Sequence, residues 1–277
     1  MFLKKLNELY NIDDDRLIKS IKINSKEVEP GDIFVCTMGV TADRHDFIDE
    51  AIKNGASAIV VSRDVGKKTV PVIKVDDTNV ELRKLSAKFY DYPYEKACMI
   101  GVTGTTGKTT VAELIYQLIS DDCAYIGTNG KKYKNKHFSM LNTTPDVDRL
   151  YKFFKEFIDN GCNTICMESS SEAFFRHRLD DIKYDYAIIT NIAEDHLNIH
   201  KTMENYVDCK CQLFRQVKDT GYSILNSNDK YFELFKKESK GTIVSYGYKE
   251  TDTLMIKDYT LKRNKTIINF KYNNKLY

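Results

Sequence analysis

The sequence predicts an α/β protein in which a small N-terminal α/β domain is followed by a larger domain with a mainly parallel sheet flanked by helices. Short apolar segments rich in β-formers alternate with helical patterns, and a glycine-rich loop separates one of these segments from a helix. Such short apolar strands are typical of parallel sheets that are buried on both faces. The length of 277 residues suits two domains, and 42% apolar residues are enough for their cores.

The first domain is expected to span residues 1–94. A break near Tyr92-Pro-Tyr-Glu95 separates it from the second domain, expected at 95–277. Within the first domain we expect strands at 33–36, 58–61 and 72–75 and helices at 47–54 and 80–90.

The second domain repeats the alternation of strands and helices. Helices at 147–160 and 203–218 fit the crossovers between parallel strands, and from about Leu254 the pattern resembles a β-hairpin. The expected strands are 97–102, 164–167, 186–189, 222–225 and 243–246.

The glycine-rich loop is the most informative motif. It reads Gly101-Val-Thr-Gly-Thr-Thr-Gly-Lys-Thr-Thr110 and follows an apolar strand. Glycines at 104 and 107 let backbone amides close around phosphate oxygens, while the helix N-terminus and Lys108 add positive charge. Thr109 is then placed to ligate Mg²⁺. These features predict a phosphate-binding loop (P-loop), although Val102 stands where the strict pattern has its first glycine.

The helix after this loop carries apolar residues with helical spacing, which we expect to pack on the sheet. They are Val111, Leu114, Ile115, Leu118 and Ile119.

Polar side chains follow the central strands of the second domain, at the sheet edge where open parallel sheets bind ligands. Glu168 follows an apolar strand and can hold a magnesium ion directly or through water. His196 lies in a segment with two acids just after the next strand, so we expect it at the same edge. Thr103, Asn191 and Asn226 end other strands there.

The composition argues against several classes of protein. The 42 basic and 40 acidic residues leave a formal charge of only +2, which gives no electrostatic argument for nucleic acid or a membrane surface. The seven cysteines fall mostly in strand or helix patterns, so we interpret them as reduced and packed in a cytosolic protein rather than as metal ligands. No apolar run reaches transmembrane length, and the N-terminus does not resemble a signal peptide.

Six motifs, of which the P-loop is the first, resemble the Mur ligase family in their order along the chain. The first domain agrees, because Ser25 to Val35 and Asp43 to Phe47 resemble the uridine-binding domain of its members. The motifs are the P-loop, Asn142-Thr-Thr-Pro145, Met167-Glu-Ser-Ser-Ser171 with Arg178, Thr190-Asn-Ile-Ala-Glu-Asp-His-Leu197, Tyr206-Val-Asp-Cys-Lys210 and Leu225-Asn-Ser-Asn-Asp229.

This resemblance implies roles for residues on the nucleotide side. Lys108 would contact the β- and γ-phosphates of ATP, Thr109 and Glu168 would hold a bridging Mg²⁺, and His196 would help to bind a second one. Lys210 matches the family's carbamylated lysine, which supports that second metal; from the residues alone it is a lysine on a helix surface. The expected ATP contacts are Gly104, Thr105, Thr106, Gly107, Lys108, Thr109, Thr110 and Asn226.

Other positions match the family's contacts with a UDP-muramoyl peptide. They are Ser25, Asn142, Thr143, Thr144, Ser170 and Arg178. The resemblance thus implies a cytoplasmic, monomeric ligase of peptidoglycan synthesis that uses ATP and Mg²⁺ to join an amino acid to UDP-N-acetylmuramoyl-dipeptide through an acyl phosphate. Either lysine or diaminopimelate could be the residue added.

The chain also departs from the family pattern. Thr106 replaces an asparagine, Glu172 a histidine, Lys26 an arginine and Arg44 a glycine, which leaves open a divergent relative with another acceptor or a nucleotide- or UDP-sugar-binding module without ligation. No segment matches the family's C-terminal domain, so we expect this chain to bind its substrates with little ligation.

Overall fold

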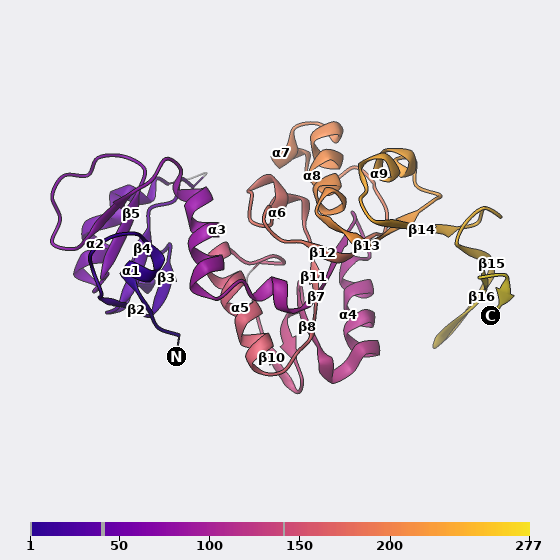
Figure 1. Ribbon diagram of the computed structural model, residues 1–277. Helices are drawn as coiled ribbons and strands as arrows, with labels where there is room; N and C mark the ends of the chain where they lie inside the picture. Colours follow the sequence, from indigo (N-terminus) through magenta and orange to yellow (C-terminus); the bar gives the residue numbers. More distant parts are fainter. Residues whose placement is uncertain (1, 40–41, 141) are drawn as a thin grey trace. The chain divides into compact units, whose positions relative to one another are not determined.

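The computed structural model describes residues 2–39, 42–140 and 142–277 (Figure 1). The chain divides into two compact units. One comprises Met1–Pro93 with Asp146–Glu156, and the other comprises Tyr94–Pro145 with Phe157–Tyr277. The segment 146–156, expected within the second domain, thus groups with the N-terminal unit. The mixed α/β fold with parallel sheets flanked by helices is confirmed.

The N-terminal unit is built on a parallel sheet with the strand order β3-β4-β5-β6. Helix α3 begins at Thr78, two residues earlier than expected, because the Asp77 side chain accepts hydrogen bonds from the first free backbone N–H groups. The main elements are β3 (Ser20–Lys22), the 3₁₀ turn η1 (Ser25–Glu27), β4 (Asp32–Val35), η2 (Arg44–Phe47), α2 (Ile48–Lys53), β5 (Ala58–Val61), β6 (Val72–Lys74) and α3 (Thr78–Phe89). Short elements precede them: β1 (Lys4–Lys5), α1 (Leu6–Leu9) and β2 (Leu17–Ile18).

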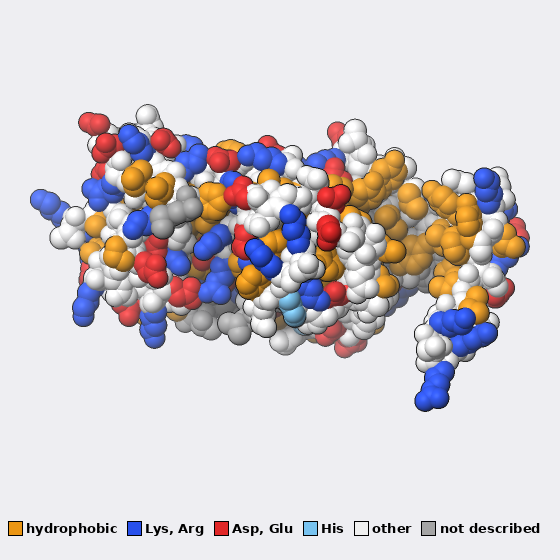
Figure 2. All heavy atoms as spheres, turned by 90° about the horizontal axis from the view of Figure 1, so that it is seen from below, with side chains coloured by type: hydrophobic (Ala, Val, Ile, Leu, Met, Phe, Trp, Pro, Cys, Tyr) orange, Lys and Arg blue, Asp and Glu red, His pale blue; other side chains and the backbone are white. Residues whose placement is uncertain are grey.

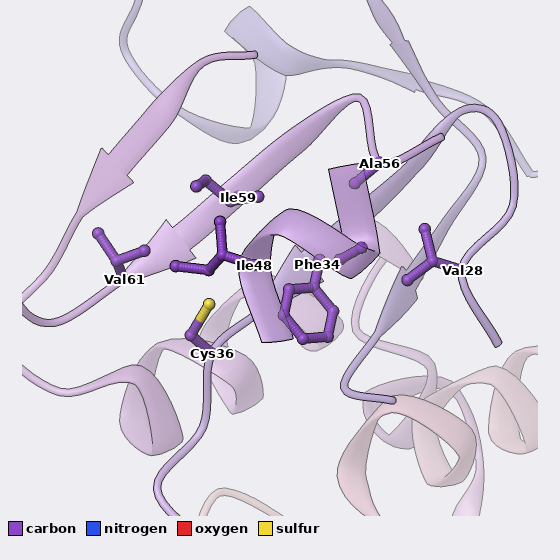
Figure 3. Close-up of a cluster of buried hydrophobic side chains, with 8 residues drawn as sticks. Val28, Phe34, Cys36, Ile48, Ala56, Ile59 and Val61 are labelled. Carbon is purple, nitrogen blue, oxygen red and sulfur yellow. The ribbon is translucent and has the colours of Figure 1, made fainter. Parts of the chain in front are cut away.

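One buried hydrophobic cluster of this unit lies between the sheet and α2. Figure 3 shows Phe34 of β4 and Ile59 of β5 close to Ile48 of α2, and all three side chains are buried. Val28, Cys36, Ala51, Ala56 and Val61 complete the cluster.

The second unit is built on a long mixed sheet with the order β10-β9-β8-β11-β7-β12-β13-β14-β15-β16-β17. The pairs along the segment β8-β11-β7-β12-β13-β14-β15 are parallel. The pairs β10-β9 and β9-β8 at one end, and β15-β16 and β16-β17 at the other, are antiparallel. The strands are β7 (Cys98–Thr103), β8 (Cys123–Gly127), β9 (Gly130–Tyr133), β10 (Lys136–Phe138), β11 (Thr164–Glu168), β12 (Tyr184–Ile189), β13 (Val217–Asn226), β14 (Thr242–Gly247), β15 (Leu254–Lys262), β16 (Lys265–Tyr272) and β17 (Lys275–Leu276). The expected strands and the C-terminal hairpin are present, but β8, β9 and β10 were not expected.

Helices cover both faces of this sheet (Figure 1). Helix α4 packs on the face that carries Ile100 and Val102, whereas Leu213 of α8 lies against Gly101 on the opposite face. Helix α8 ends at Arg215 rather than 218, because the chain enters β13 at Val217. The helices of this unit are η3 (Pro93–Lys96), α4 (Lys108–Ile119), η4 (Ser120–Asp122), α6 (Ser171–Phe175), α7 (Leu197–His200), α8 (Met203–Arg215) and α9 (Phe232–Glu238). Helix α5 (Val147–Asp159) groups with the N-terminal unit up to Glu156.

The packing of α4 differs from the sequence expectation. Its contact with the core is made by Ala112, Val111 and Ile115. Leu114 is half exposed, Leu118 is 84% exposed and Ile119 is also exposed, so the prediction that the whole apolar stripe packs on the sheet was wrong for these three positions. Ala112 and Ile115 lie on a different side of the helix from the Leu114–Leu118 row, and a helix offers only one face to a sheet.

Charged side chains of both signs are interspersed on the face of the molecule seen in Figure 2, in keeping with the formal charge of +2. Among the described residues, no helix has both the length and the apolar character needed to cross a membrane.

Candidate functional site

The P-loop connects β7 to α4 at the carboxyl edge of the sheet. Gly107 caps α4 in the left-handed region at φ 84°, and Gly104 has φ 144°. A Cβ atom at position 104 would come within 1.9 Å of the Thr190 hydroxyl oxygen. Both positions therefore require glycine, for backbone conformation and, at 104, for space as well.

The loop is fastened to the segment that follows β12. The Thr190 hydroxyl donates to the carbonyl of Thr106 at 2.6 Å, and the Asn191 side chain bonds both the backbone and the hydroxyl of Thr106. Asn191 also accepts the Thr105 N–H through its own carbonyl at 2.8 Å. Thr106, which replaces the family's asparagine, is thus held by side chains from the neighbouring strand end.

Glu168, at the end of β11, is fully buried and accepts hydrogen bonds from four donor groups among the described residues. Its Oε1 accepts from the Tyr125 hydroxyl at 2.6 Å and from the Thr128 N–H at 2.8 Å. Its Oε2 accepts from the hydroxyls of Thr109 at 2.9 Å and Thr128 at 3.2 Å. Gly127 makes this arrangement possible, since a Cβ there would lie 2.1 Å from Oε1.

The oxygens of Thr109 and Glu168 fit a magnesium ion. Mg²⁺ binds octahedrally at about 2.0–2.1 Å, so neighbouring ligand oxygens lie about 2.9 Å apart. The Thr109 Oγ1 to Glu168 Oε2 distance is 2.9 Å. The two donors on Oε2 are hydroxyls that can rotate, whereas the backbone N–H on Oε1 cannot. Oε2 is therefore the oxygen that can turn to a metal.

Two lysines converge on the carbonyl oxygen of Gly104. Lys108 Nζ donates to it at 2.9 Å and Lys210 Nζ at 2.8 Å. Burial lowers the pKa of Lys108. Burial, followed by repulsion from Lys108, lowers the pKa of Lys210 to about 7. Lys210 is only 1% exposed, so the interpretation of it as a surface lysine was wrong.

His196 lies at the mouth of the same region. It has a left-handed backbone conformation with φ 53°, its side chain is half exposed, and its Nε2 lies 3.5 Å from Asp195 Oδ2. Such a conformation is uncommon for a residue other than glycine and points to a local functional constraint.

A cavity of about 370 Å³ brings the two groups of expected site residues together. Lys108, Thr109, Glu168 and His196, which were expected on the nucleotide side, all line it. Its complete lining is Thr105, Gly107, Lys108, Thr109, Thr128, Asn142, Thr143, Thr144, Glu168, Ser170, Ser171, Glu172, Arg178 and His196.

The residues expected to contact the acceptor are connected to one another. The Thr144 hydroxyl donates to the Glu168 carbonyl at 2.9 Å and lies 3.2 Å from the Ser170 hydroxyl. Ser170 caps α6 by accepting the Ala173 N–H, and Arg178 donates to the Thr144 carbonyl at 3.2 Å. Asn142 and Thr143 line the cavity beside them.

Some expected site residues do not line the cavity. Thr110 is exposed on α4, and Asn226 donates to the Thr190 carbonyl at 2.8 Å, so it supports the segment that holds the P-loop. Ser25 belongs to the N-terminal unit, where its hydroxyl donates to Glu50. Tyr125 and Thr128 contact Glu168 but were missed, because no local motif marks residues 40 to 43 positions before their partner.

Two family models match this chain, and both describe the same family. A model described as Mur ligase middle domain matches residues 102–277, and one described as Mur ligase family, catalytic domain, matches residues 17–93. The chain belongs to the Mur ligase family. The family resemblance drawn from the sequence motifs is thereby confirmed.

Curated relatives of this Mur ligase include two from Oceanobacillus iheyensis. One, named UDP-N-acetylmuramoyl-L-alanyl-D-glutamate--2,6-diaminopimelate ligase, is 37% identical over 94% of this chain and 56% of its own length. The other, named UDP-N-acetylmuramyl-tripeptide synthetase 2, is 39% identical over 85% of this chain and 50% of its own length. The chain therefore spans about half the length of the curated relatives that it matches.

Solved structures show the same fold. A diaminopimelate ligase structure superposes with a TM-score of 0.83 at 24% identity, covering 99% of this chain and 59% of the other. The MurF ligase of Thermotoga maritima in complex with ADP superposes with a TM-score of 0.64 at 23% identity. The match covers 94% of this chain and 57% of the other.

Proposed function

We propose that this chain carries the first part of an ATP-dependent ligase that adds the third residue to UDP-N-acetylmuramoyl-dipeptide in peptidoglycan precursor synthesis. The observation that carries the proposal is that one cavity is lined by P-loop residues and Glu168 and also by Thr144, Ser170 and Arg178. The names of the two Oceanobacillus iheyensis relatives support the substrate class. The reaction would join a substrate carboxylate to an amine through an acyl phosphate.

The main task of such a site is to bring two anions together, the acceptor carboxylate and the γ-phosphate. Lys108 would supply a positive charge next to the phosphates, and the P-loop amides would bind their oxygens. Thr109 and Glu168 would hold Mg²⁺, with His196 and a carbamylated Lys210 near a second ion. Bound Mg²⁺ supplies neutralisation of the phosphate charge. The ADP complex of the Thermotoga maritima relative supports the nucleotide assignment.

The acceptor side would be formed by Arg178 and the hydroxyls around it. Arg178 lines the cavity and, by donating to the Thr144 carbonyl, is directed at the Asn142-Thr-Thr-Pro145 turn. A guanidinium in this position suits a carboxylate or phosphate group of the acceptor. We propose that Ser25 of the N-terminal unit contacts the uridine end of the same molecule.

Calorimetric titration tests this function directly. We expect the chain to bind a nonhydrolysable ATP analogue with Mg²⁺ and, separately, UDP-N-acetylmuramoyl-dipeptide. Lys108→Ala should weaken binding of the analogue by at least about tenfold, because a charge-assisted contact of about 1.4 kcal/mol or more is lost. Glu168→Ala should weaken it only when Mg²⁺ is present.

Lys183→Ala, at an exposed position before β12, is the matched control and should bind both ligands as the unchanged chain does. Nucleotide affinity that is the same in all three variants would contradict the nucleotide site. Absence of acceptor binding by the unchanged chain would contradict the substrate class.

A further inference from the structure

The buried histidine His200 has no part in the proposed chemistry, yet it lies directly behind the cavity. His200 is only 1% exposed, and its Nε2 lies 3.0 Å from the Ser171 hydroxyl oxygen. Ser171 is itself 3% exposed, begins α6 and lines the acceptor side of the cavity. His200 is thus in hydrogen-bond contact with a cavity residue.

The other face of His200 leads to the P-loop. Its ring centroid lies 5.3 Å from that of Tyr206 on α8. The Tyr206 hydroxyl lies 3.0 Å from the Thr105 hydroxyl, and Thr105 lines the nucleotide side of the cavity. Ser171, His200, Tyr206 and Thr105 therefore form a continuous chain of contacts between the two sides, of which the first three are buried and Thr105 is partly exposed.

The backbone of His200 adds a third connection. Its N–H donates to the carbonyl of His196 at 3.0 Å, which fixes the short helix α7 that follows His196. His200 therefore contacts Ser171 of α6, Tyr206 beside the P-loop and the turn that carries His196.

A nucleophilic role for the Ser171–His200 pair is not supported. An activated serine needs a base whose second ring nitrogen is oriented by another group. The Nδ1 of His200 has no hydrogen-bond partner among the described residues. The geometry suits a structural connection instead.

We propose that His200 is a positioning residue that couples acceptor binding to nucleotide binding, an inference that rests on the proposed function. A ligand that orders Ser171 restricts His200 and, through Tyr206, the P-loop residue Thr105. Such coupling is reciprocal, so each ligand must tighten the other by the same factor. In the unchanged chain we expect the acceptor to bind at least about fivefold more tightly when the nucleotide site is filled.

The experiment measures the dissociation constant of UDP-N-acetylmuramoyl-dipeptide by calorimetry, without and with a saturating nonhydrolysable ATP analogue and Mg²⁺. His200→Ala should bring the ratio of the two constants close to 1. His200→Gln, which keeps an amide nitrogen near the Nε2 position, should recover most of the ratio. Tyr206→Phe keeps the buried ring but removes the hydroxyl, so it should lower the ratio with little risk to folding.

His137→Ala, at an exposed histidine on β10, serves as the control and should keep the full ratio. A ratio near 1 in the unchanged chain, or an unchanged ratio in both Tyr206→Phe and a folded His200→Ala, overturns the coupling while leaving the proposed function in place. Failure of the unchanged chain to bind the acceptor overturns both.

Discussion

At the scale of single residues, the two oxygens of Glu168 differ in what holds them. Oε1 is held by a backbone N–H and by the hydroxyl of the buried Tyr125 ring, while Oε2 is held by rotatable threonine hydroxyls. Tyr125 therefore holds Oε1 of the carboxylate, whereas Thr109 bonds the other oxygen, Oε2. It orients the group without being placed to contact a metal.

Removing this hydroxyl should affect magnesium selectively. Tyr125→Phe deletes one hydrogen bond to a charged group, worth about 1.5–3 kcal/mol. We expect Mg²⁺-dependent nucleotide affinity to fall by about tenfold and Mg²⁺-free affinity to change little, as measured by titration at several Mg²⁺ concentrations. Tyr116→Phe is the matched control, because that hydroxyl donates to the Lys134 carbonyl. Equal affinities in both variants would show that Thr128 and Thr109 suffice to hold Glu168.

Lys210 is the second residue whose environment predicts a measurable property. Burial and the nearby Lys108 lower its pKa to about 7, so the neutral amine is available near neutral pH. The neutral amine can condense with bicarbonate, forming an N–C bond and releasing water. An ordinary lysine, with a pKa of about 10.4, is almost fully protonated there.

We expect one ¹³C carbamate signal when labelled bicarbonate is added at fixed concentration. The lowered pKa means that the neutral fraction rises as pH increases through about 7, so the signal should grow between pH 6 and pH 8 and then level off. Lys210→Ala should lack it. A signal that keeps increasing toward pH 10, or persists in the variant, would belong to surface lysines instead.

At the scale of elements, the sequence pattern of α4 predicts that a helix forms, but it does not determine which of its apolar residues pack on the sheet. Its spacing predicts a helix with an apolar stripe, and the helix is present from Lys108 to Ile119. The stripe is too wide to face the sheet completely, so packing selects Ala112 and Ile115 and leaves Leu118 exposed.

This difference can be measured by mutation. Leu118→Gln should change the free energy of unfolding by no more than about 0.5 kcal/mol, as is usual for exposed positions. Ile115→Ala should cost about 1–2 kcal/mol, less than for a fully buried isoleucine, because its side chain is partly buried against the core. Chemical denaturation of both variants provides the comparison. A loss of more than about 1.5 kcal/mol for Leu118→Gln would mean that this side chain is covered in solution.

Much of the fold and part of the site could be predicted from the sequence. The P-loop and the strand-end Glu168 carry local signals, because glycine spacing and position after an apolar strand are both visible in the chain. β9 was missed because Gly130-Lys-Lys-Tyr133 looks polar, although Lys131 is buried with its Nζ 4.6 Å from the Phe138 ring. The burial of Lys131 depends on the pairing of β9 with β8 and β10, which a short stretch of sequence does not reveal.

Lys210 could have been recognised from the pattern of its own helix. Tyr206 and Phe214 lie one helical turn before and after it, and both are buried. A lysine in the middle of an apolar face is uncommon and signals a functional environment. The contacts of Tyr125 with Glu168 carry no such signal, since they join separate strands.

At the scale of the whole molecule, α5 is shared between the two units. Its residues up to Glu156 belong to the N-terminal unit, and those from Phe157 belong to the second. Within the first group, Leu150, Tyr151 and Phe154 are fully buried, and Nη2 of Arg149 donates to both carboxylate oxygens of Glu27. The N-terminal unit is therefore completed by a helix that comes later in the chain.

Separating the chain at the break near Pro93 should therefore destabilise the second piece. In residues 94–277 alone, Leu150, Tyr151 and Phe154 would lose the unit to which they belong, and burial of each such side chain is worth about 1.5–3 kcal/mol. Their sum is comparable to the total stability of a typical domain, about 5–15 kcal/mol. We expect this piece to melt well below the full chain and to bind a dye for exposed apolar surface. Residues 1–93 added in trans should reverse part of this change, whereas a melting temperature equal to that of the full chain would show that α5 needs no partner from the N-terminal unit.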